Sequence, residues 1–138
     1  MRELCCYCGG VSVEKLSGSV QDYLKAVWVL GEWSNEPVTT SKIAARVGVR
    51  PATASETIKK LAKQALVEHS PYGAITLSEE GRCLALAMVR RHRLIETFLV
   101  EKLGYGWDEV HAEAEVLEHA VSDLMVERIT AAVAHPTR

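Results

Sequence analysis

Apolar residues recur every three or four positions along most of the chain, which is the spacing of amphipathic helices. In the first half this spacing predicts a helix over residues 17–33 and a short helix over residues 39–47. Gly48 favours the left-handed turn that ends a helix, and Pro51 suits the first turn of a third helix. The third helix is predicted to turn these apolar side chains inward: Ala54, Ile58, Leu61, Ala62 and Ala65.

The chain then changes to strand patterns and returns to helices. Two short β-prone runs, 66–69 and 74–77, enclose turn residues and predict a β-hairpin. Ser78 and the two acids after it predict the start of a long helix that Gly104 ends. Two shorter helices are predicted after it, over residues 107–120 and 122–134.

This order of elements predicts a mainly α fold built from two small domains. A short helix pair followed by a hairpin is a winged helix–turn–helix, which we expect over residues 17–77. The remaining helices form a second, helical domain over residues 78–138. We expect residues 1–16 to be a flexible tail outside both domains.

Composition excludes several classes of protein. With 138 residues, 48% of them hydrophobic, the chain is long enough for one ordinary domain or two small ones. Its longest apolar run, Cys83–Val89, is far shorter than the roughly 18 residues that a membrane-spanning helix needs. The N-terminus lacks the apolar stretch of a secretory signal, so we expect a cytoplasmic protein without a membrane partner.

Three of the four cysteines crowd the N-terminus, at Cys5, Cys6 and Cys8. The pair Cys5-x-x-Cys8 is half of a zinc knuckle, but no second half lies nearby. A reduced tail without a metal is the favoured alternative, and no role is assigned to these thiols.

The formal net charge of −2 conceals two opposed segments. Residues 38–63 carry a net charge of +5, and residues 101–127 carry −7. A basic segment indicates an anionic partner. An acidic segment that also holds two histidines indicates a cation.

The basic segment holds the residues expected to read DNA. In a winged helix the third helix enters the major groove, and the hairpin lies along the backbone. The side of this helix opposite Ile58 and Leu61 offers hydroxyls that can reach base edges and lysines that can meet phosphates, while Glu56 can accept from a cytosine amino group. The residues assigned to DNA are Thr40, Ser41, Arg50, Thr53, Ser55, Glu56, Lys59, Lys60 and Tyr72. The alternative is a winged helix that makes protein contacts only.

The acidic segment holds a candidate metal site. On a helix, four potential ligands fall within one stripe of about 100°: His111, Glu115, Glu118 and His119. On the preceding long helix, His92 and Glu96 are four residues apart. Oxygen-rich ligands with one or two imidazoles suit a fairly hard divalent ion such as Mn²⁺ or Fe²⁺. The alternative is a solvated acidic face with two incidental histidines.

These patterns together resemble the diphtheria toxin repressor family of metal-dependent transcriptional repressors, most closely its manganese transport regulator branch. The resemblance covers about Ser19 to Pro136. The stretches that carry it are Asp22-Tyr23-Leu24, Ile43-Ala44, Thr53-x-Ser55-x-Thr57, Leu77-Ser78-x-x-Gly81, Arg91-His92-Arg93-Leu94-x-Glu96 and His111-Ala112-Glu113-Ala114-x-x-x-Glu118-His119.

The resemblance implies a metal role for each matching position. It implies a primary, activating site of Asp22, Glu115, Glu118 and His119, and a second site of His92, Glu96 and His111. The iron-responsive branch carries methionine at the position of Asp22 and cysteine at that of Glu115. Both are carboxylates here, which suits Mn²⁺ because this ion gains less from sulfur than iron does.

One position departs from the manganese branch, which often has an acid one turn after the position of Asp22. This chain has Lys25 there, so we expect two separated metal sites rather than a close pair of ions. Many members of the family carry a third, SH3-like domain. The sequence ends about where the linker to that domain would begin, so this is either a short member or a shortened one.

The resemblance implies a homodimeric repressor, activated by a divalent metal, that binds palindromic operator DNA and controls genes of metal-ion homeostasis. The last three helices match the family's dimerisation domain. Mn²⁺ is the expected cofactor, with Fe²⁺ as the alternative and Zn²⁺, Co²⁺ or Cd²⁺ as surrogates in vitro. Neither catalysis nor a small organic substrate is expected. The rival functions are a winged-helix regulator that answers an organic ligand and a hydrolase that uses the carboxylate–histidine centre.

Overall fold

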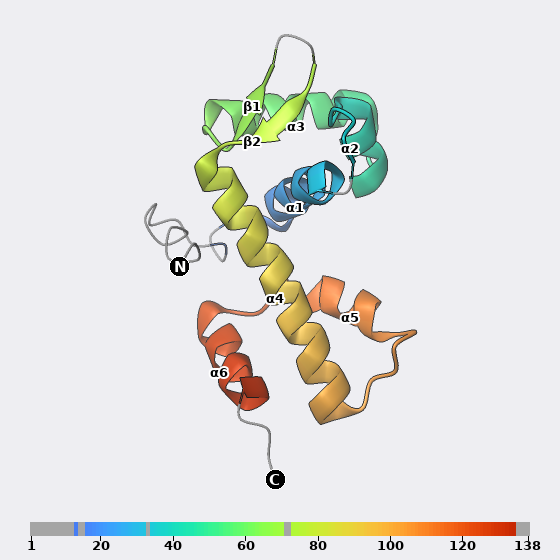
Figure 1. The fold of residues 1–138 in the computed structure, drawn as a ribbon, viewed down its shortest axis with the longest axis vertical. Helices are drawn as coiled ribbons and strands as arrows, with labels where there is room; N and C mark the ends of the chain where they lie inside the picture. Colours follow the sequence, from blue (N-terminus) through green and yellow to red (C-terminus); the bar gives the residue numbers. More distant parts are fainter. Residues whose placement is uncertain (1–12, 14–15, 33, 71–72, 135–138) are drawn as a thin grey trace. The chain divides into compact units, whose positions relative to one another are not determined.

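The computed structural model describes residues 13, 16–32, 34–70 and 73–134. The chain divides into two compact units between Leu86 and Ala87, and each is described by itself. The predicted mainly α fold is confirmed, because six helices and one small hairpin make up the regular structure of the described residues (Figure 1). None of the helices found there is both long enough and apolar enough to span a membrane.

The first unit contains a helix–turn–helix and a hairpin, as its sequence predicts. Its elements, in chain order, are α1 (Gly18–Glu32), α2 (Thr40–Val47), α3 (Pro51–Lys63), β1 (Val67–His69), β2 (Ile75–Leu77) and the first turns of α4 (Glu79–Leu103). The largest fully buried side chains of this unit come from four different elements, so one apolar core joins them: Leu24, Ile43, Ile58, Leu61 and Ile75.

The turn between α2 and α3 follows from its sequence. The Thr39 hydroxyl accepts a hydrogen bond from the Lys42 amide at 3.2 Å and caps the start of α2. Gly48 ends the helix with a φ of 80°, in the left-handed region, and its amide donates to the Ala44 carbonyl. Pro51 then begins α3, where a missing N–H costs nothing.

The inward face of α3 is narrower than predicted. Ala54, Ile58 and Leu61 are buried, but Ala62 and Ala65 are exposed, so their predicted inward positions are wrong. Ala62 lies in the last turn of α3, next to the buried Leu61, and faces solvent. Ala65 lies beyond Lys63, where the helix has ended and the chain turns away from it. Ala65 has a φ of 62°, and the amide of Leu66 bonds back to the Leu61 carbonyl at 3.0 Å. This turn directs the chain into β1.

The hairpin is tied to the start of α4 through a single carbonyl oxygen. β1 and β2 pair antiparallel, with Val67 opposite Leu77 and His69 opposite Ile75. The Leu66 carbonyl accepts from the Ser78 amide at 3.0 Å and from the Ser78 hydroxyl at 3.1 Å. A Cβ on Gly81 would lie 2.0 Å from the same oxygen, so this close approach requires glycine.

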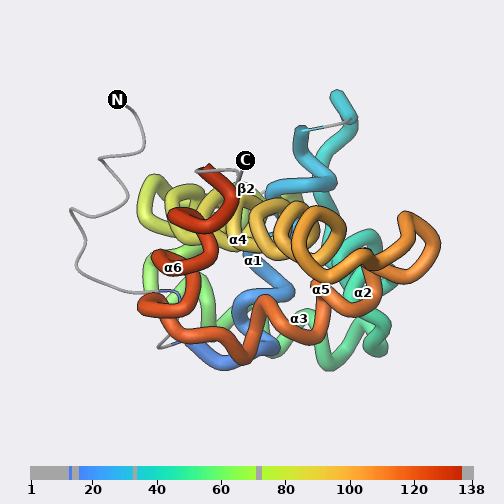
Figure 2. Tube along the Cα trace, turned by 90° about the horizontal axis from the view of Figure 1, so that it is seen from below, coloured from blue at the N-terminus to red at the C-terminus, as the bar shows by residue number. Residues whose placement is uncertain are grey.

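The second unit consists of the rest of α4, α5 (Val110–Leu117) and α6 (Asp123–Ala134). Figures 1 and 2 both show α5 and α6 packed beside α4. The buried residues that join them form one apolar cluster: Ile95, Leu99, Val110, Ala114, Val121 and Ile129. The space between the helices of this unit is therefore filled by side chains.

The helix α5 is shorter at both ends than the predicted range of 107–120. Before it, the Gly106 carbonyl accepts from the amides of Glu109 and Val110, which makes residues 107–109 a turn. After it, the Leu117 carbonyl accepts from both Ala120 and Val121. Glu118 is the C-cap residue and His119 lies in the turn that follows. Two of the predicted metal ligands therefore sit where α5 ends.

Candidate metal centre and nucleic-acid interface

The residues assigned to DNA lie on the outer side of the helix–turn–helix. Ile58 and Leu61 hold α3 in the core, and the side chains opposite them face solvent. The exposed members are Ser41, Arg50, Thr53, Glu56, Lys59 and Lys60, while Thr40 and Ser55 are half-buried. Tyr72 lies outside the described residues. The α3 surface thus offers hydroxyls, one carboxylate and a row of lysines, which can meet base edges and phosphates.

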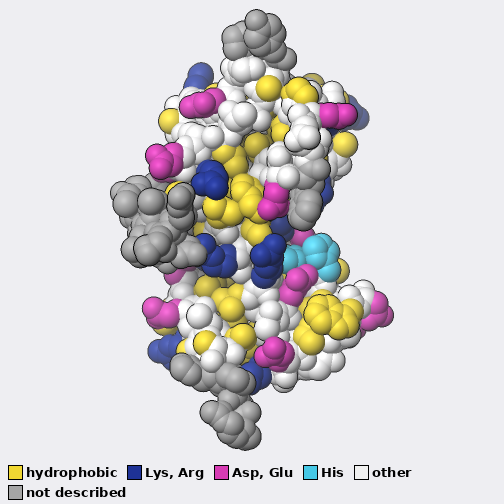
Figure 3. Space-filling model, in the orientation of Figure 1, with side chains coloured by type: hydrophobic (Ala, Val, Ile, Leu, Met, Phe, Trp, Pro, Cys, Tyr) yellow, Lys and Arg dark blue, Asp and Glu magenta, His cyan; other side chains and the backbone are white. Residues whose placement is uncertain are grey.

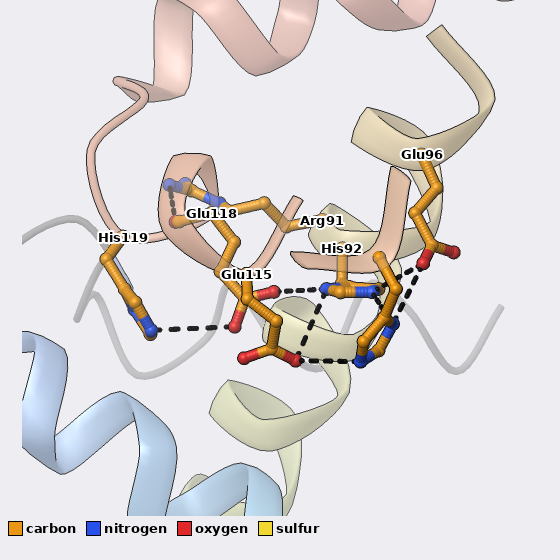
Figure 4. Close-up of polar contacts among 7 residues, drawn as sticks. Arg91, His92, Glu96, Glu115, Glu118 and His119 are labelled. Atoms are coloured by element: carbon orange, nitrogen blue, oxygen red, sulfur yellow. Dashed lines mark hydrogen bonds and ion pairs between the residues drawn. The ribbon is translucent and has the colours of Figure 1, made fainter. Parts of the chain in front are cut away.

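The candidate metal centre of the second unit is built from α4 and α5. α4 supplies His92 and Glu96, which are four residues apart and so lie on one face of the helix. α5 supplies His111 and Glu115 with the same spacing, and its C-terminal end supplies Glu118 and His119. Figure 4 shows the labelled ones, His92, Glu96, Glu115, Glu118 and His119, gathered in one region where the end of α5 meets α4. Histidine and acidic side chains also gather on the face drawn in Figure 3.

The imidazole of His92 is at the centre of the cluster. Its Nδ1 lies 2.5 Å from a carboxylate oxygen of Glu118. Its Nε2 lies 2.8 Å from Glu96 Oε2 and 3.1 Å from His111 Nδ1. Both ring nitrogens therefore face other potential ligands (Figure 4).

Glu115 belongs to the same cluster. Its Oε2 lies 3.4 Å from His111 Nε2 and 3.9 Å from His92 Nδ1. One donor atom each from His92, His111 and Glu115 lie within 4.8 Å of one another. Ligands of one ion are at most about two metal–ligand bond lengths apart, roughly 4–5 Å. The sequence assigns Glu115 to the primary site and the two histidines to the second, and the structure brings all three together.

Burial separates the members of the cluster. Glu118 is fully buried and His92 is 7% exposed. Three other side chains of the cluster are more exposed to solvent: His119 at 24%, Glu115 at 41% and His111 at 69%. A buried carboxylate is costly without a charged or hydrogen-bonding partner. The oxygens of Glu118 contact His92 on one side and His119, at 3.6 Å, on the other. A divalent ion in this cluster would neutralise carboxylates held close together.

The donor set fits a divalent ion of intermediate hardness. Within the described residues the cluster offers carboxylate oxygens and imidazole nitrogens, and no thiol takes part in it. Such donors suit Mn²⁺ or Fe²⁺ better than Cu⁺ or a structural zinc. Asp22, the remaining predicted ligand, lies half-buried on α1 in the first unit, and its assignment to the metal stays a prediction.

Sequence reasoning gave no role to one residue beside the centre, Arg91. It is 6% exposed and makes hydrogen bonds to the segment that follows α5. The helical spacing could have indicated that Arg91 is buried, because it comes three residues after Met88 and four before Ile95, both of which are buried. Its neighbours Arg90 and Arg93 are exposed.

Two surface groups outside the cluster, Tyr105 and Glu36, have pKa values shifted by a neighbouring charged side chain. The carboxylate of Glu113 raises the pKa of Tyr105, whose hydroxyl donates to it at 3.3 Å. A hydrogen bond from Lys42 and the charge of that lysine lower the pKa of Glu36. Both groups are open to solvent, so neither shift makes a large contribution to stability.

Comparison with known proteins identifies both halves of the chain. Residues 15–75 match the family model of the iron dependent repressor N-terminal DNA binding domain. Residues 78–138 match that of the iron dependent repressor metal binding and dimerisation domain. The two matches together cover most of the chain.

Individual relatives agree with the family models. An uncharacterised HTH-type transcriptional regulator of Methanocaldococcus jannaschii is 35% identical over 83% of this chain and 91% of its own length. The iron-dependent repressor IdeR of Mycobacterium tuberculosis is 33% identical over 91% of this chain and 54% of its own length. A solved manganese-dependent transcriptional repressor, in complex with manganese, is 60% identical, with a TM-score of 0.78, over 86% of this chain and 54% of its own.

These matches define a transcription regulator in which a DNA-binding domain precedes a metal-binding and dimerisation domain. The chain belongs to the iron-dependent, or diphtheria toxin, repressor family of metal-dependent transcriptional repressors, and the resemblance inferred from its sequence is confirmed. It spans about half the length of IdeR and of the solved manganese-dependent repressor.

Proposed function

We propose that this protein is a manganese-responsive repressor that binds palindromic operator DNA as a homodimer and controls genes of metal-ion homeostasis. The observation that carries the proposal is the convergence of His92, Glu115 and Glu118 from α4 and α5, in a chain whose other unit exposes a basic α3. A sensor of this kind needs both parts. Catalysis has no role in it.

The preference for Mn²⁺ over Fe²⁺ rests on the ligand types. Asp22 and Glu115 are carboxylates at positions where the iron-responsive branch has sulfur ligands. The 60% identity to a repressor solved with manganese supports the same choice. Fe²⁺ is the alternative physiological ion, because oxygen and imidazole ligands also suit it. Zn²⁺, Co²⁺ and Cd²⁺ are expected to occupy the same ligands in vitro.

The ion would act by neutralising the acidic segment. In the proposed primary site, Asp22 of α1 joins Glu115, Glu118 and His119, while His92, Glu96 and His111 form the second site. In the empty protein the carboxylates of the acidic segment repel one another. A divalent ion removes that repulsion and fixes the recognition helices of a dimer about 34 Å apart, one turn of DNA. By linkage, operator DNA then tightens metal binding.

Exposed apolar side chains of the second unit support a homodimer. Five large ones are open to solvent in the single chain: Leu103, Trp107, Val116, Leu124 and Met125. Apolar side chains are visible on the face drawn in Figure 3. Exposed apolar surface of this extent favours burial against another protein surface, and the matched family domain is a dimerisation domain.

Operator binding tests the proposal directly. Duplex DNA is selected from a random pool with Mn²⁺ present, and its binding is followed by gel shift with Mn²⁺, with anaerobic Fe²⁺ and with a chelator. We expect a palindromic duplex that is bound with Mn²⁺ and released by the chelator. Asp22→Ala and His119→Ala should abolish the metal dependence, and Glu113→Gln, an exposed acid on α5, should keep it.

The other outcomes identify the rivals. Tighter binding with Fe²⁺ than with Mn²⁺ would favour the iron-responsive alternative. DNA binding that ignores metal in the wild type would favour a regulator that answers an organic ligand. No DNA binding in any metal state would contradict the repressor and favour a metal-dependent hydrolase.

A further inference from the structure

Arg91 lies inside the second unit, immediately before His92 on α4. Its side chain is 6% exposed. A buried guanidinium is costly unless its N–H groups are bonded, because it loses the water that solvates the charge. The partners of this one all belong to residues 118–123, the segment that joins α5 to α6.

The guanidinium bonds this segment at three points. One terminal nitrogen donates to the Val121 carbonyl at 2.8 Å and to the Glu118 carbonyl at 3.4 Å. The other donates to Asp123 Oδ1 at 2.7 Å and forms an ion pair with it. Figure 4 shows Arg91 extended beside Glu118. The planar guanidinium suits this task, because its donors are arranged in a fixed fork.

These bonds hold two helix ends at once. The Glu118 carbonyl is among the last of α5, which have no partner inside the helix. A positive charge is favourable there because the helix dipole is negative at that end. Asp123 is the first residue of α6, where a negative charge is favoured, and Ser122 caps that helix through the Met125 amide. Two of the proposed metal ligands, Glu118 and His119, belong to the segment that these bonds hold.

We propose that Arg91 is a positioning residue for metal binding. It fixes the main chain of Glu118 and His119 against α4, which carries His92 and Glu96. The ion then finds ligands from α4 and from the end of α5 already in place. The inference rests on the proposed metal-binding function, and it adds a residue that does not itself touch the ion. Losing a residue that orients a metal ligand typically weakens metal affinity about 10- to 100-fold.

The test is the affinity of the purified chain for Mn²⁺, measured from the signal of free Mn²⁺ in electron paramagnetic resonance. Arg91→Gln removes the charge and most of the bonds. Asp123→Asn removes only the ion pair and leaves the two carbonyl bonds possible. Arg93→Gln is the matched control, because it removes the same charge from an exposed position on the same helix.

We expect Arg91→Gln to weaken Mn²⁺ binding by about 10- to 100-fold. Asp123→Asn should weaken it by less, and Arg93→Gln should leave it within about twofold of the wild type. Affinities are measured at a temperature where circular dichroism shows every metal-free variant to be folded. Under that condition a lower global stability does not change the affinity, so a loss reports the placement of the ligands.

Arg91→Lys covers the case in which Arg91→Gln does not fold. Lysine keeps the charge, but a single ammonium cannot bond both carbonyls and the carboxylate in the same geometry. We expect a loss of about threefold or more, smaller than that of a folded Arg91→Gln. A folded Arg91→Gln, or in its absence Arg91→Lys, that binds Mn²⁺ as the wild type does would overturn the positioning role. A wild type that binds no Mn²⁺ would instead contradict the proposed function, and the positioning role with it.

Discussion

The outward face of α3, which is proposed to read DNA, and the candidate metal centre relate differently to the cores of their units. On α3, folding and function use opposite faces: Ile58 and Leu61 are buried, and Lys60 points outward. In the candidate metal centre two of the proposed ligands are also part of the core, because Glu118 is fully buried and His92 nearly so. The outward face of α3 therefore takes no part in the core of the first unit. The candidate metal centre lies partly inside the core of the second unit.

This difference predicts how each region responds to change. Replacing outward residues of α3 should alter DNA binding while leaving the thermal stability as it was. Replacing buried ligands should alter metal affinity and stability together. Binding a metal should also stabilise the second unit, because an ion that binds only the folded state adds its binding free energy to folding.

The largest expected effect comes from Glu118→Gln, which keeps the shape of the buried side chain and removes its charge. Mn²⁺ affinity should fall by about 100-fold or more, since a direct ligand should matter at least as much as a residue that orients one. For the wild type, Mn²⁺ at 100 times its Kd should add about 2.7 kcal/mol of stability. Calorimetry with and without Mn²⁺ measures that stabilisation, which the variant should lose.

Glu113→Gln is the control for Glu118→Gln, since it removes the same charge from an exposed position on α5. It should keep the stabilisation by Mn²⁺. A Glu118→Gln protein that is stabilised by Mn²⁺ as strongly as the wild type would show that the carboxylate of Glu118 does not bind the ion.

Gly81→Ala is expected to have an effect of similar size, and it acts on the fold of the first unit alone. Its Cβ would meet the Leu66 carbonyl oxygen at 2.0 Å, so the hairpin or the start of α4 must shift. We expect a loss of about 3 kcal/mol in the free energy of unfolding, measured by urea denaturation. Gly31→Ala is the control, because its Cβ would meet Val38 at an ordinary 3.8 Å. Equal stability of the two variants would contradict this close approach.

Lys60→Ala tests a residue that is expected to contribute to DNA binding and not to the stability of the fold. The side chain is exposed on α3, so the melting temperature should stay within about a degree of the wild type. The slope of the logarithm of operator affinity against that of salt concentration should become shallower by about 1 per lost phosphate contact, hence about 2 per dimer. Lys102→Ala, on α4 of the second unit, should leave the slope unchanged. A lowered melting temperature with an unchanged slope would reverse the assignment.

Ala65→Gly carries the smallest effect. Ala65 has a φ of 62°, in the left-handed region that glycine adopts without steric cost. We expect the substitution to stabilise the first unit by about 0.5–1 kcal/mol, measured by the same urea denaturation. Operator affinity should not change, because Ala65 lies beyond the end of α3. A destabilised variant would mean that the methyl group of Ala65 has a packing role.

Local signals in the sequence predicted the elements whose ends are decided locally. Gly48 and Pro51 marked the turn of the helix–turn–helix, because each acts through its own backbone. The ends of α5 escaped prediction, since bonds from Ala120 and Val121 to the Leu117 carbonyl close that helix early. Helix propensities of single residues do not show whether the chain will form this turn or continue the helix.

The sequence predicted which residues belong to the candidate metal centre, but it did not predict which of them lie close together. Histidine and acid at a spacing of four marked both the His92 and the His111 pairs. Spacing along one helix could not show that Glu115 reaches His92 on another helix, because that distance depends on how α4 and α5 pack. The thiols of Cys5, Cys6 and Cys8 lie outside the described residues.

The separation of a buried face and an exposed face on α3 also has an evolutionary consequence. A duplicated gene can exchange Thr53, Glu56 or Lys60 one at a time, because none of these side chains holds the helix in place. If these residues read the operator as proposed, each exchange should change which operator is preferred and leave the protein able to fold. The buried proposed ligands, His92 and Glu118, should have no such freedom, since a change there is expected to alter sensing and folding in the same step. Descendants of this chain should therefore diverge first in the genes they control and last in the ion they sense.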